Sequence, residues 1–461
     1  MTGTLDEPAF ARAFDEMIRR QPVLRTSFEP RGTSAVQRIH ASVDFTLFPA
    51  EDLSPLPDAQ REARLALRLD ELTGQTFDLQ RAALQGAPLP GGSAGARAVL
   101  HGPPHHLGRV VLRHPVRGLS SLCGAFSRGL PAPRPELPFT YGDFAAWHRD
   151  WCAGEEFAAQ LAFWRSRLDR LEAALALPTD RPRRPGMSEQ GRHRSDDDRS
   201  LSPGFAACDR PPGRATLFLT TLAAYSALLH GYAGQERLVI GTPVRGRNAV
   251  ELEPIMGYFN NLVPLAIDVD PGQSFLALLE RVKSAAVESF ASPDVPLEQL
   301  AGELAVRRGA GGGSLLYQAL FSFQDARRRD TRWGDLVHEV VPLFQKGATE
   351  DLGLWFVESE RGLHGGVTYN TDILDRATAR ELRRLPRPPG GHCGRSNEVG
   401  GGTARIEGRG GADEGSRRCA SDAGRPRPAG PRAHGNAAVH GDRAAPGRDL
   451  ARAAQGASGV S

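Results

Sequence analysis

The chain has 461 residues, and its 57 Lys and Arg against 54 Asp and Glu give a net charge of +3 at pH 7. This length can bury a substantial core and favours two or three domains, while so small a net charge identifies no nucleic-acid or membrane partner. The five cysteines lack the spacing of a metal site or disulfide framework, and no segment has the length and apolarity of a leader or membrane span. We therefore expect a cytoplasmic protein without a metal, a membrane or a nucleic-acid partner.

Residues 5–84 have the patterns of ordinary α/β structure. Apolar side chains at helical spacing predict a helix through Phe10, Phe14, Met17 and Ile18. The stretch LRTSF at 24–28 then predicts a strand.

From residue 85 to 122 the character of the chain changes. Periodicity is lost, and Gly, Pro and Arg become frequent without a pattern of caps or turns to account for them.

Regular patterning returns with PELPFTYGDFAAWHRDW at 135–151. One long amphipathic helix is predicted, with an apolar side made of Phe144, Trp147, Phe157, Leu161, Trp164 and Leu168. The proline-rich stretch 175–185 ends it and predicts a stiff linker, and residues 187–212 again lose their periodicity.

Residues 214–300 have the strongest patterning. Thr216 can cap a helix whose apolar residues are Phe218, Leu222, Tyr225, Leu229 and Tyr232. A short apolar strand at 238–240 ends at Gly241 and Pro243, and alternation at 265–270 predicts a second strand with one buried face. Ser274 then begins another amphipathic helix, so the stretch has an α/β layout.

Further strands are predicted at 317–323 and 352–356. Residues 386–461 follow, rich in Gly, Arg, Ala and Pro and almost free of large apolar side chains. Such a tail cannot bury enough surface to offset its ordering entropy, so we expect it to be disordered.

Several phrases of this sequence resemble one known family. Three segments resemble, in this order, the second half of a condensation domain from a non-ribosomal peptide synthetase: GTPVRGR at 241–247, MGYFNNLV at 256–263 and SPDVPLEQL at 292–300. Three further segments are similar to parts of its first half: RQPVLRTSF at 20–28, TFDLQRAAL at 76–84 and the 135–151 stretch. In the first of them Gln21-Pro22 replaces the family's usual His-Glu.

The resemblance implies a fold of two chloramphenicol-acetyltransferase-like lobes that form a V around a central channel. Residues 1–180 would be the N-terminal lobe, 181–385 the C-terminal lobe, and 386–461 a tail outside both. The N-terminal lobe is expected to be incomplete, because the family's first strand and helix have no counterpart before Met1.

The family's catalytic HHxxxDG motif is missing where residues 85–122 stand. His105 and His106 are followed by LGRVV, without an Asp-Gly at the required offset. Codons can be chosen for residues 102–117 so that reading one base later gives VHHIISDGWSFGILF, which contains the motif. We hypothesise that 85–122 is translated off-frame, that the frame recovers by Gly124, and that the tail 386–461 is also off-frame text. An arginine-glycine tail that binds RNA is the alternative, although the tail lacks the aromatic residues that stack on bases.

No catalytic residue and no metal ligand can therefore be assigned in this chain, and the candidate site residues have supporting roles. Arg247 matches the family arginine proposed to hold the motif aspartate, and a solvent-facing loop residue is the alternative. Asn260 and Asn261 could hydrogen-bond an acyl or pantetheine group near the channel, or satisfy backbone groups where the lobes meet. Gly241 and Pro243 are expected to shape a turn beside the channel.

The resemblance implies amide formation between two acyl groups, each carried as a thioester on the phosphopantetheine arm of a carrier protein. Those arms belong to the partner carrier domains, so no cofactor is expected on this chain, and an adenylation domain is expected next to it in an intact gene. Without the motif we expect little or no activity. The alternatives are a non-catalytic domain that docks carrier proteins, and an acyltransferase that uses coenzyme A.

Overall fold

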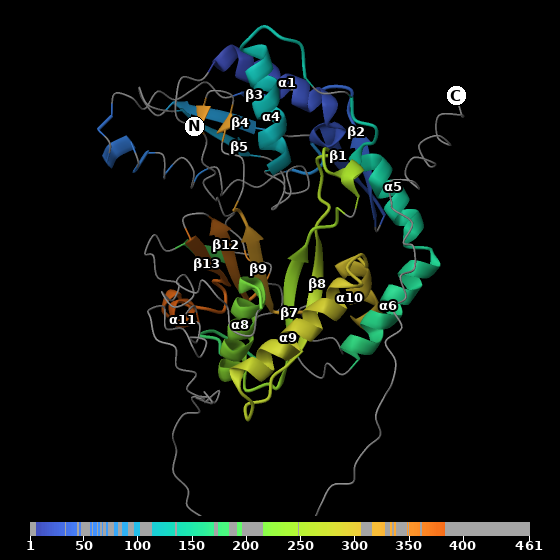
Figure 1. Cartoon of the computed structure of the whole chain (residues 1–461), viewed down its shortest axis with the longest axis vertical. Helices are drawn as coiled ribbons and strands as arrows, with labels where there is room; N and C mark the ends of the chain where they lie inside the picture. Colours follow the sequence, from blue (N-terminus) through green and yellow to red (C-terminus); the bar gives the residue numbers. More distant parts are fainter. Residues whose placement is uncertain are drawn as a thin grey trace, which may run out of the picture.

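The computed structural model of the whole chain describes residues 6–43 except 33, short stretches between 46 and 101, then 113–183, 191–195, 215–305 and 316–382 with short gaps. Within these residues the chain forms an upper and a lower lobe (Figure 1). The tail 386–461 and the two histidines at 105 and 106 lie outside the described residues.

The described part of the N-terminal lobe combines α-helices and a 3-10 turn with small sheets. A hairpin of β1 and β2 stands beside a sheet of order β3-β4-β5. Its elements are α1 (Glu7–Arg20), the 3-10 turn η1 (Pro22–Arg25), β1 (Thr26–Arg31), β2 (Ser34–Ile39), β3 (Thr46–Leu47), β4 (Gln85–Pro90), β5 (Ala96–His101) and α4 (Arg113–Phe126).

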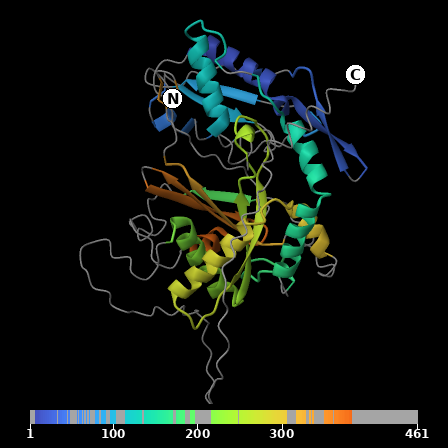
Figure 2. The same ribbon diagram turned by 45° about the vertical axis from the view of Figure 1, so that its right-hand side comes forward.

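The C-terminal lobe is built on a six-stranded mixed sheet of order β6-β13-β12-β9-β7-β8. Two long helices, α8 and α9, pack against this sheet (Figures 1 and 2). Its elements are β6 (Gly191–Ser195), α8 (Leu217–Ala233), β7 (Arg237–Val244), η3 (Val250–Leu252), β8 (Asn261–Asp268), α9 (Phe275–Phe290), α10 (Leu297–Ala305), β9 (Ala319–Asp325), β12 (Leu352–Ser359), β13 (Gly362–Asn370) and α11 (Arg376–Glu381). Between β9 and β12 the chain crosses to the upper lobe, where the small hairpin of β10 (Arg332–Trp333) and β11 (Leu336–Val337) contacts α4 (Figure 1).

Two helices run from the upper lobe to the lower one along the side of the molecule (Figure 1). They are α5 (Tyr141–Trp151) and α6 (Glu155–Leu168), where the sequence predicted one continuous helix. The break falls at Gly154, which is extended and serves as the N-cap of α6. Leu161, Trp164 and Leu168 of α6 belong to the core of the C-terminal lobe, whereas α5 contacts η1 of the N-terminal lobe, so the helix pair packs on both lobes.

The first helix confirms the predicted apolar stripe. Asp6 accepts a hydrogen bond from the Ala9 N–H at 3.0 Å and so caps the helix, and Phe10, Phe14, Met17 and Ile18 are all buried. The strand predicted from residue 24 begins only at Thr26, because Pro22 opens a 3-10 turn that includes Leu24.

Residues 85–122, where the sequence shows no periodicity, contain β4, β5 and most of α4. Helix α4 packs against α1, and Leu119, Leu122 and Cys123 of α4 share one buried cluster with the apolar stripe of α1. Burial against a neighbouring helix therefore gives this stretch a regular structure that its local sequence pattern did not indicate.

Two predicted helices of the C-terminal lobe are confirmed with their caps. Thr216 accepts from the Leu219 N–H, and Ser274 accepts from the Ala277 N–H. Helix α8 is buried on every side between Thr220 and His230, so the single apolar face predicted for it is wrong, and Tyr232 is 41% exposed. A helix that is apolar all round occupies the centre of its lobe.

Gly241 and Pro243 lie inside strand β7 and do not form the turn that was expected. Strand β9 pairs with β7 only at Ile240 and Gly241, so beyond Gly241 the strand has β8 alone as a neighbour among the described strands. A proline is tolerated there because its missing N–H faces no second strand of that described sheet. At Gly241 a Cβ would lie 2.6 Å from the ring of Tyr317, so only glycine allows this ring to pack against the strand.

Candidate functional site

Segments that are far apart in the sequence meet where the two lobes join. Arg247 at the end of GTPVRGR contacts the segment 249–259, this segment contacts helix α5, and α5 contacts the loop 292–295 through His148. We call residues 249–259 the junction segment; it leaves the lower lobe after β7 and returns to it at β8. Leu252, Ile255 and Phe259 of this segment form a small core with Phe139, beside Tyr141 and Phe144.

Arg247 organises the junction segment from within. Its Nε donates to the carbonyl of Leu252 at 3.2 Å and its Nη2 to the carbonyl of Ile255 at 2.8 Å. The guanidinium carbon lies 4.1 Å from the centre of the Phe259 ring. Burial, with a smaller effect from the charge of Arg245, lowers the pKa of Arg247 to about 10. The solvent-facing alternative for Arg247 is therefore wrong, and its role beside a motif aspartate stays a prediction.

Tyr141, the first residue of α5, connects the helix to the junction segment. Its hydroxyl donates to the carbonyl of Tyr258 at 2.8 Å, and burial raises its pKa to about 12. The ring packs closely on Gly257, where φ is +153° and a Cβ would lie 2.2 Å from Cδ2 of Tyr141. Gly257 thus serves both a backbone conformation unusual for other residues and a close ring contact.

Aromatic rings continue this contact along α5. Phe144 lies 4.6 Å from Phe259 between ring centres and stacks on His148, which in turn stacks on Trp151. The side of α5 that faces the junction is therefore a continuous aromatic surface. Asp143 completes a capping box with Thr140 at the start of α5.

The two adjacent asparagines differ in their surroundings. Asn261 donates through Nδ2 to the carbonyls of Pro293 at 2.7 Å and Val295 at 2.6 Å, so it satisfies backbone groups of the neighbouring loop. Asn260 has a buried Oδ1 that makes no hydrogen bond to any described residue. Contact of either amide with a substrate group stays a prediction.

The loop 292–295 is also tied to the helix pair. Gln160 donates to Oδ2 of Asp294 at 3.2 Å and accepts from the Asp294 N–H at 3.1 Å. Trp164 donates to the carbonyl of Ser292 at 2.8 Å. Helix α6, this loop and Asn261 are thereby joined as one unit.

Sequence reasoning named Gln21 as a departure from the family pattern but gave it no role in the site. Gln21, at the end of α1, bonds through its side chain to Pro254 and Met256 of the junction segment. The available signal was its place in RQPVLRTSF, where it departs from the family's usual residue.

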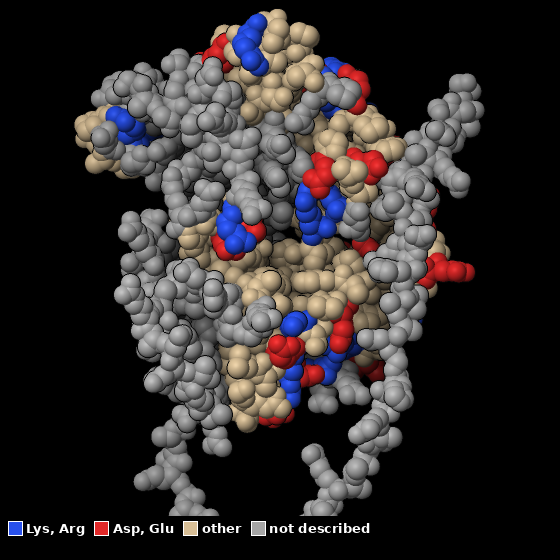
Figure 3. Space-filling model, viewed as in Figure 1, with Lys and Arg blue, Asp and Glu red and all other residues tan. Residues whose placement is uncertain are grey.

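Neither a large charged patch nor a metal-binding cluster marks the described part of the site. On the face shown in Figure 3, which is recessed between the two halves, basic and acidic side chains lie in small adjacent groups. Across the described residues, no three His, Cys, Asp or Glu side chains are placed to hold a metal ion. Nor does that part of the chain contain a helix of the length and apolarity needed to cross a membrane.

Comparison with known proteins identifies relatives over most of the chain. The family model "Condensation domain" matches residues 1–385. A linear gramicidin synthase protein of Brevibacillus parabrevis is 34% identical over 391 residues, which cover 82% of this chain and 5% of that protein. Chondramide synthase cmdD of Chondromyces crocatus is 33% identical over 82% of this chain and 10% of its own length. The chain thus spans only a small part of these relatives.

Solved structures show the same architecture. The X-domain from teicoplanin biosynthesis matches with a TM-score of 0.67 and 26% identity, covering 83% of this chain and 86% of that one. The condensation domain of the Monacolin K polyketide synthase MokA matches with a TM-score of 0.65 at 20% identity, over 83% and 88% of the two chains, which supports the fold alone. The predicted two-lobed α/β fold class is confirmed.

Proposed function

The chain belongs to the condensation-domain family, and on that premise we propose that it is the condensation unit of a non-ribosomal peptide synthetase. In this role it would join two acyl or aminoacyl groups, each held as a thioester on a carrier protein, through an amide bond. The nitrogen of one group attacks the thioester carbon of the other, the C–S bond breaks, and the amine proton and the thiolate leave as a thiol. An adjacent adenylation domain and the carriers' phosphopantetheine arms are the partners that this reaction implies.

One observation carries the proposal: the segments that resemble the family motifs converge on one place. Tyr141 of the 135–151 stretch bonds to the junction segment, Arg247 of GTPVRGR holds that segment, and Asn261 of MGYFNNLV holds the loop 292–295. A site between two lobes suits a reaction with two carrier-borne substrates, because each arm can approach from a different side.

We propose further that the chain with its present sequence at 102–117 is inactive. Attack by an amine requires a group that accepts or orients its proton, and a histidine near its ordinary pKa contributes about 10² to 10⁴ in rate in such a role. In the family the second histidine of HHxxxDG is placed for this, and no counterpart stands in this sequence.

The test replaces residues 85–122 by the sequence of the restored reading frame, in which positions 102–116 become VHHIISDGWSFGILF. The starting chain, the replaced chain and a replaced chain with alanine at the second motif histidine are compared on carrier proteins loaded with aminoacyl thioesters. We expect amide product only from the chain with both histidines. Equal product from the starting chain would refute the proposed inactivity, and no product from any of them would refute the condensation reaction for these substrates. Sequencing the gene across the codons for residues 80–125 and 380–400 tests the frameshift itself.

A non-catalytic docking function is the second candidate. A solved relative at 26% identity is the teicoplanin X-domain in complex with another protein, OxyB, and this chain lacks the catalytic motif. A docking domain would bind a loaded carrier in a pull-down or calorimetric titration, and the motif replacement would yield no product. Turnover of an acyl-coenzyme A without any carrier would instead identify the coenzyme-dependent acyltransferase.

A further inference from the structure

Gln21 makes a two-point contact that neither the family motifs nor the proposed reaction explains. Its Nε2 donates to the carbonyl of Pro254 at 2.9 Å, and its Oε1 accepts from the N–H of Met256 at 2.9 Å. One primary amide thus satisfies a donor and an acceptor of the same backbone segment. Only 9% of Gln21 is exposed, so water cannot readily replace either bond.

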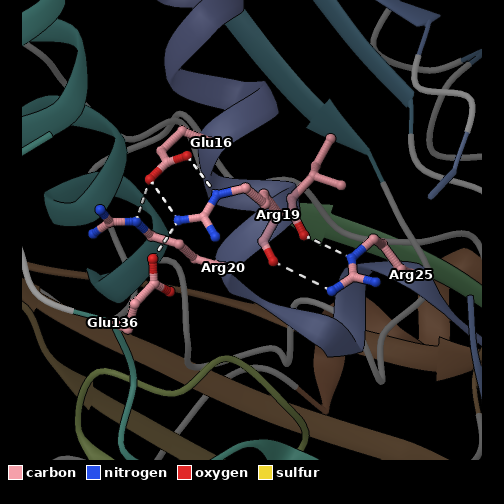
Figure 4. A network of polar contacts seen from close by, with 6 residues as sticks. Glu16, Arg19, Arg20, Arg25 and Glu136 are labelled. Atoms are coloured by element: carbon pink, nitrogen blue, oxygen red, sulfur yellow. Dashed lines mark hydrogen bonds and ion pairs between the residues drawn. The ribbon is translucent and has the colours of Figure 1, made fainter. Parts of the chain in front are cut away.

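Contacts at the end of α1 hold Gln21 in position independently of its bonds to the junction segment. Its own N–H donates to the Met17 carbonyl at the end of α1, and Arg25 donates to the carbonyls of Ile18 and Arg19 at 3.1 and 3.2 Å. Figure 4 shows Arg25 reaching back to these carbonyls at the end of the helix. The side chain therefore loses little further freedom when it binds the junction segment.

Polar contacts on the other side of the same turn hold the end of α1 as well. Glu16 pairs with Arg19 at 2.8 Å and with Arg20 at 2.5 Å, and Arg19 also reaches Glu136 at 2.5 Å (Figure 4). The stretch around Glu136 leads directly into α5. Gln21 thus stands on a helix end that is braced by several neighbours.

Beside Gln21, the junction segment places one apolar side chain in the upper lobe. Met256 is 2% exposed and belongs to the cluster formed by α1 and α4, which includes Leu119, Leu122 and Cys123. Ile255 and Phe259 instead join the small core with Phe139. The segment enters β8 of the lower lobe at Asn261, so the backbone that inserts Met256 above is continuous with the sheet below.

We propose that Gln21 and Met256 form a lock between the lobes, in which Gln21 is a positioning residue that sets the opening of the molecule at the junction. Met256 supplies the apolar contact, and Gln21 fixes the backbone on both sides of it, at residues 254 and 256. Release of the amide allows the segment to withdraw Met256 from the α1–α4 cluster. This inference does not depend on amide-forming activity, since it concerns only the contact between lobes.

The native thiol of Cys123 provides the assay. Cys123 is 5% exposed and lies in the same cluster as Met256, so its reaction with iodoacetamide requires opening at this place. Peptide-resolved mass spectrometry separates its alkylation from that of the other cysteines. In Gln21→Met the side chain keeps its length but loses both bonds. Two hydrogen bonds of ordinary net strength correspond to about 30-fold in an equilibrium constant, so we expect Cys123 to react about 30-fold faster.

Gln160→Met is the matched control. Gln160 is also buried, at 6% exposure, and also makes a two-point contact through its amide, but its partner Asp294 lies in the loop that packs with α6 in the lower lobe. One of its two bonds ends on the Asp294 carboxylate, so the loss is at least as large as that in Gln21→Met. We nevertheless expect less than about 3-fold acceleration at Cys123 in this variant, because the lost bonds lie elsewhere in the molecule. Equal acceleration in both variants, or none in Gln21→Met, would overturn the lock.

Hydrogen exchange gives a second readout that general destabilisation does not reproduce. Peptides covering 249–259 should lose protection in Gln21→Met, whereas peptides covering 292–299 should lose it in Gln160→Met. Gln21→Asn keeps the primary amide on a side chain that is one methylene shorter, so it cannot keep both bonds at their present lengths, and its effect should fall between those of the native chain and Gln21→Met. If Gln21→Met does not fold, Gln21→Asn decides, and unchanged protection of 249–259 in it would count against the lock.

Discussion

Arg245 and Arg247 stand two residues apart at the junction and offer a direct comparison between an exposed and a buried arginine. Arg245 pairs with Glu253 at 2.6 Å, with 43% and 36% of the two side chains exposed. Arg247 is 9% exposed and bonds to the carbonyls of Leu252 and Ile255. We predict that Arg247→Met destabilises the protein far more than Arg245→Met does.

The magnitude follows from what each variant leaves behind. Arg247→Met removes two charge-assisted hydrogen bonds and leaves two carbonyls without their donor, which costs about 1 to 3 kcal/mol for each group. Loss of the stack on Phe259 adds about 0.5 to 2 kcal/mol. Relief of the desolvation that lowers the pKa of Arg247 offsets part of this, so we expect a net loss of about 2 to 3 kcal/mol. An exposed pair such as Arg245 with Glu253 contributes about 0.2 to 1 kcal/mol.

Chemical denaturation followed by tryptophan fluorescence measures the difference. The Arg245→Met effect should shrink at high salt, because exposed charges are screened, whereas the Arg247→Met effect should persist. Arg247→Lys keeps the charge without the fork of donors, so it should recover only part of the loss. Equal destabilisation by the two methionine variants, or full recovery with lysine, would refute the role of Arg247 as the organiser of the junction segment.

Three further predictions concern neighbouring residues. The pKa of Tyr141 rises from the usual 10 to about 12, so its contribution to the unfolding free energy is complete below pH 10 and is lost as the pH rises towards 12. Between pH 9 and pH 11 the unfolding free energy of Tyr141→Phe should therefore fall by roughly 1 kcal/mol less than that of the native chain, as measured by denaturation at each pH. Gly257→Ala should cost about 2 to 4 kcal/mol through backbone strain and the clash with Tyr141, and a thermal midpoint equal to that of the native chain would contradict the close contact. Asn261→Ala should lower the unfolding free energy by about 2 kcal/mol because two carbonyls lose their donor. Asn260→Ala removes a buried oxygen without a partner among the described residues, so it should change the unfolding free energy by less than about 0.5 kcal/mol. Equal costs for the two variants would contradict these assignments.

The family match also limits what a motif can tell about individual residues. Asn261 stands in MGYFNNLV, which identified the family, yet its amide is used on the backbone of the loop 292–295. Asn260, its neighbour, has the unpartnered oxygen within the described part of the chain. The pair was predicted together, and only the tertiary structure distinguishes the two members.

Local patterns determined the elements that depend on neighbours in sequence. Helices α1, α8 and α9 could be predicted from their apolar residues and caps, since Asp6, Thr216 and Ser274 each bond to an N–H three residues ahead. The motifs identified the family and the two lobes, because the order and spacing of such phrases are properties of the sequence itself.

Tertiary structure decided everything that depends on partners far along the chain. Gln21 and Met256 are 235 residues apart, and no local pattern links them. Gly241 and Pro243 carry the signal of a turn, yet pairing with β8 keeps both in a strand. Helix α4 had no recognisable pattern and forms where it is buried against α1. In each case, long-range burial and hydrogen bonding outweigh local propensities, which amount to only about 1 kcal/mol per residue.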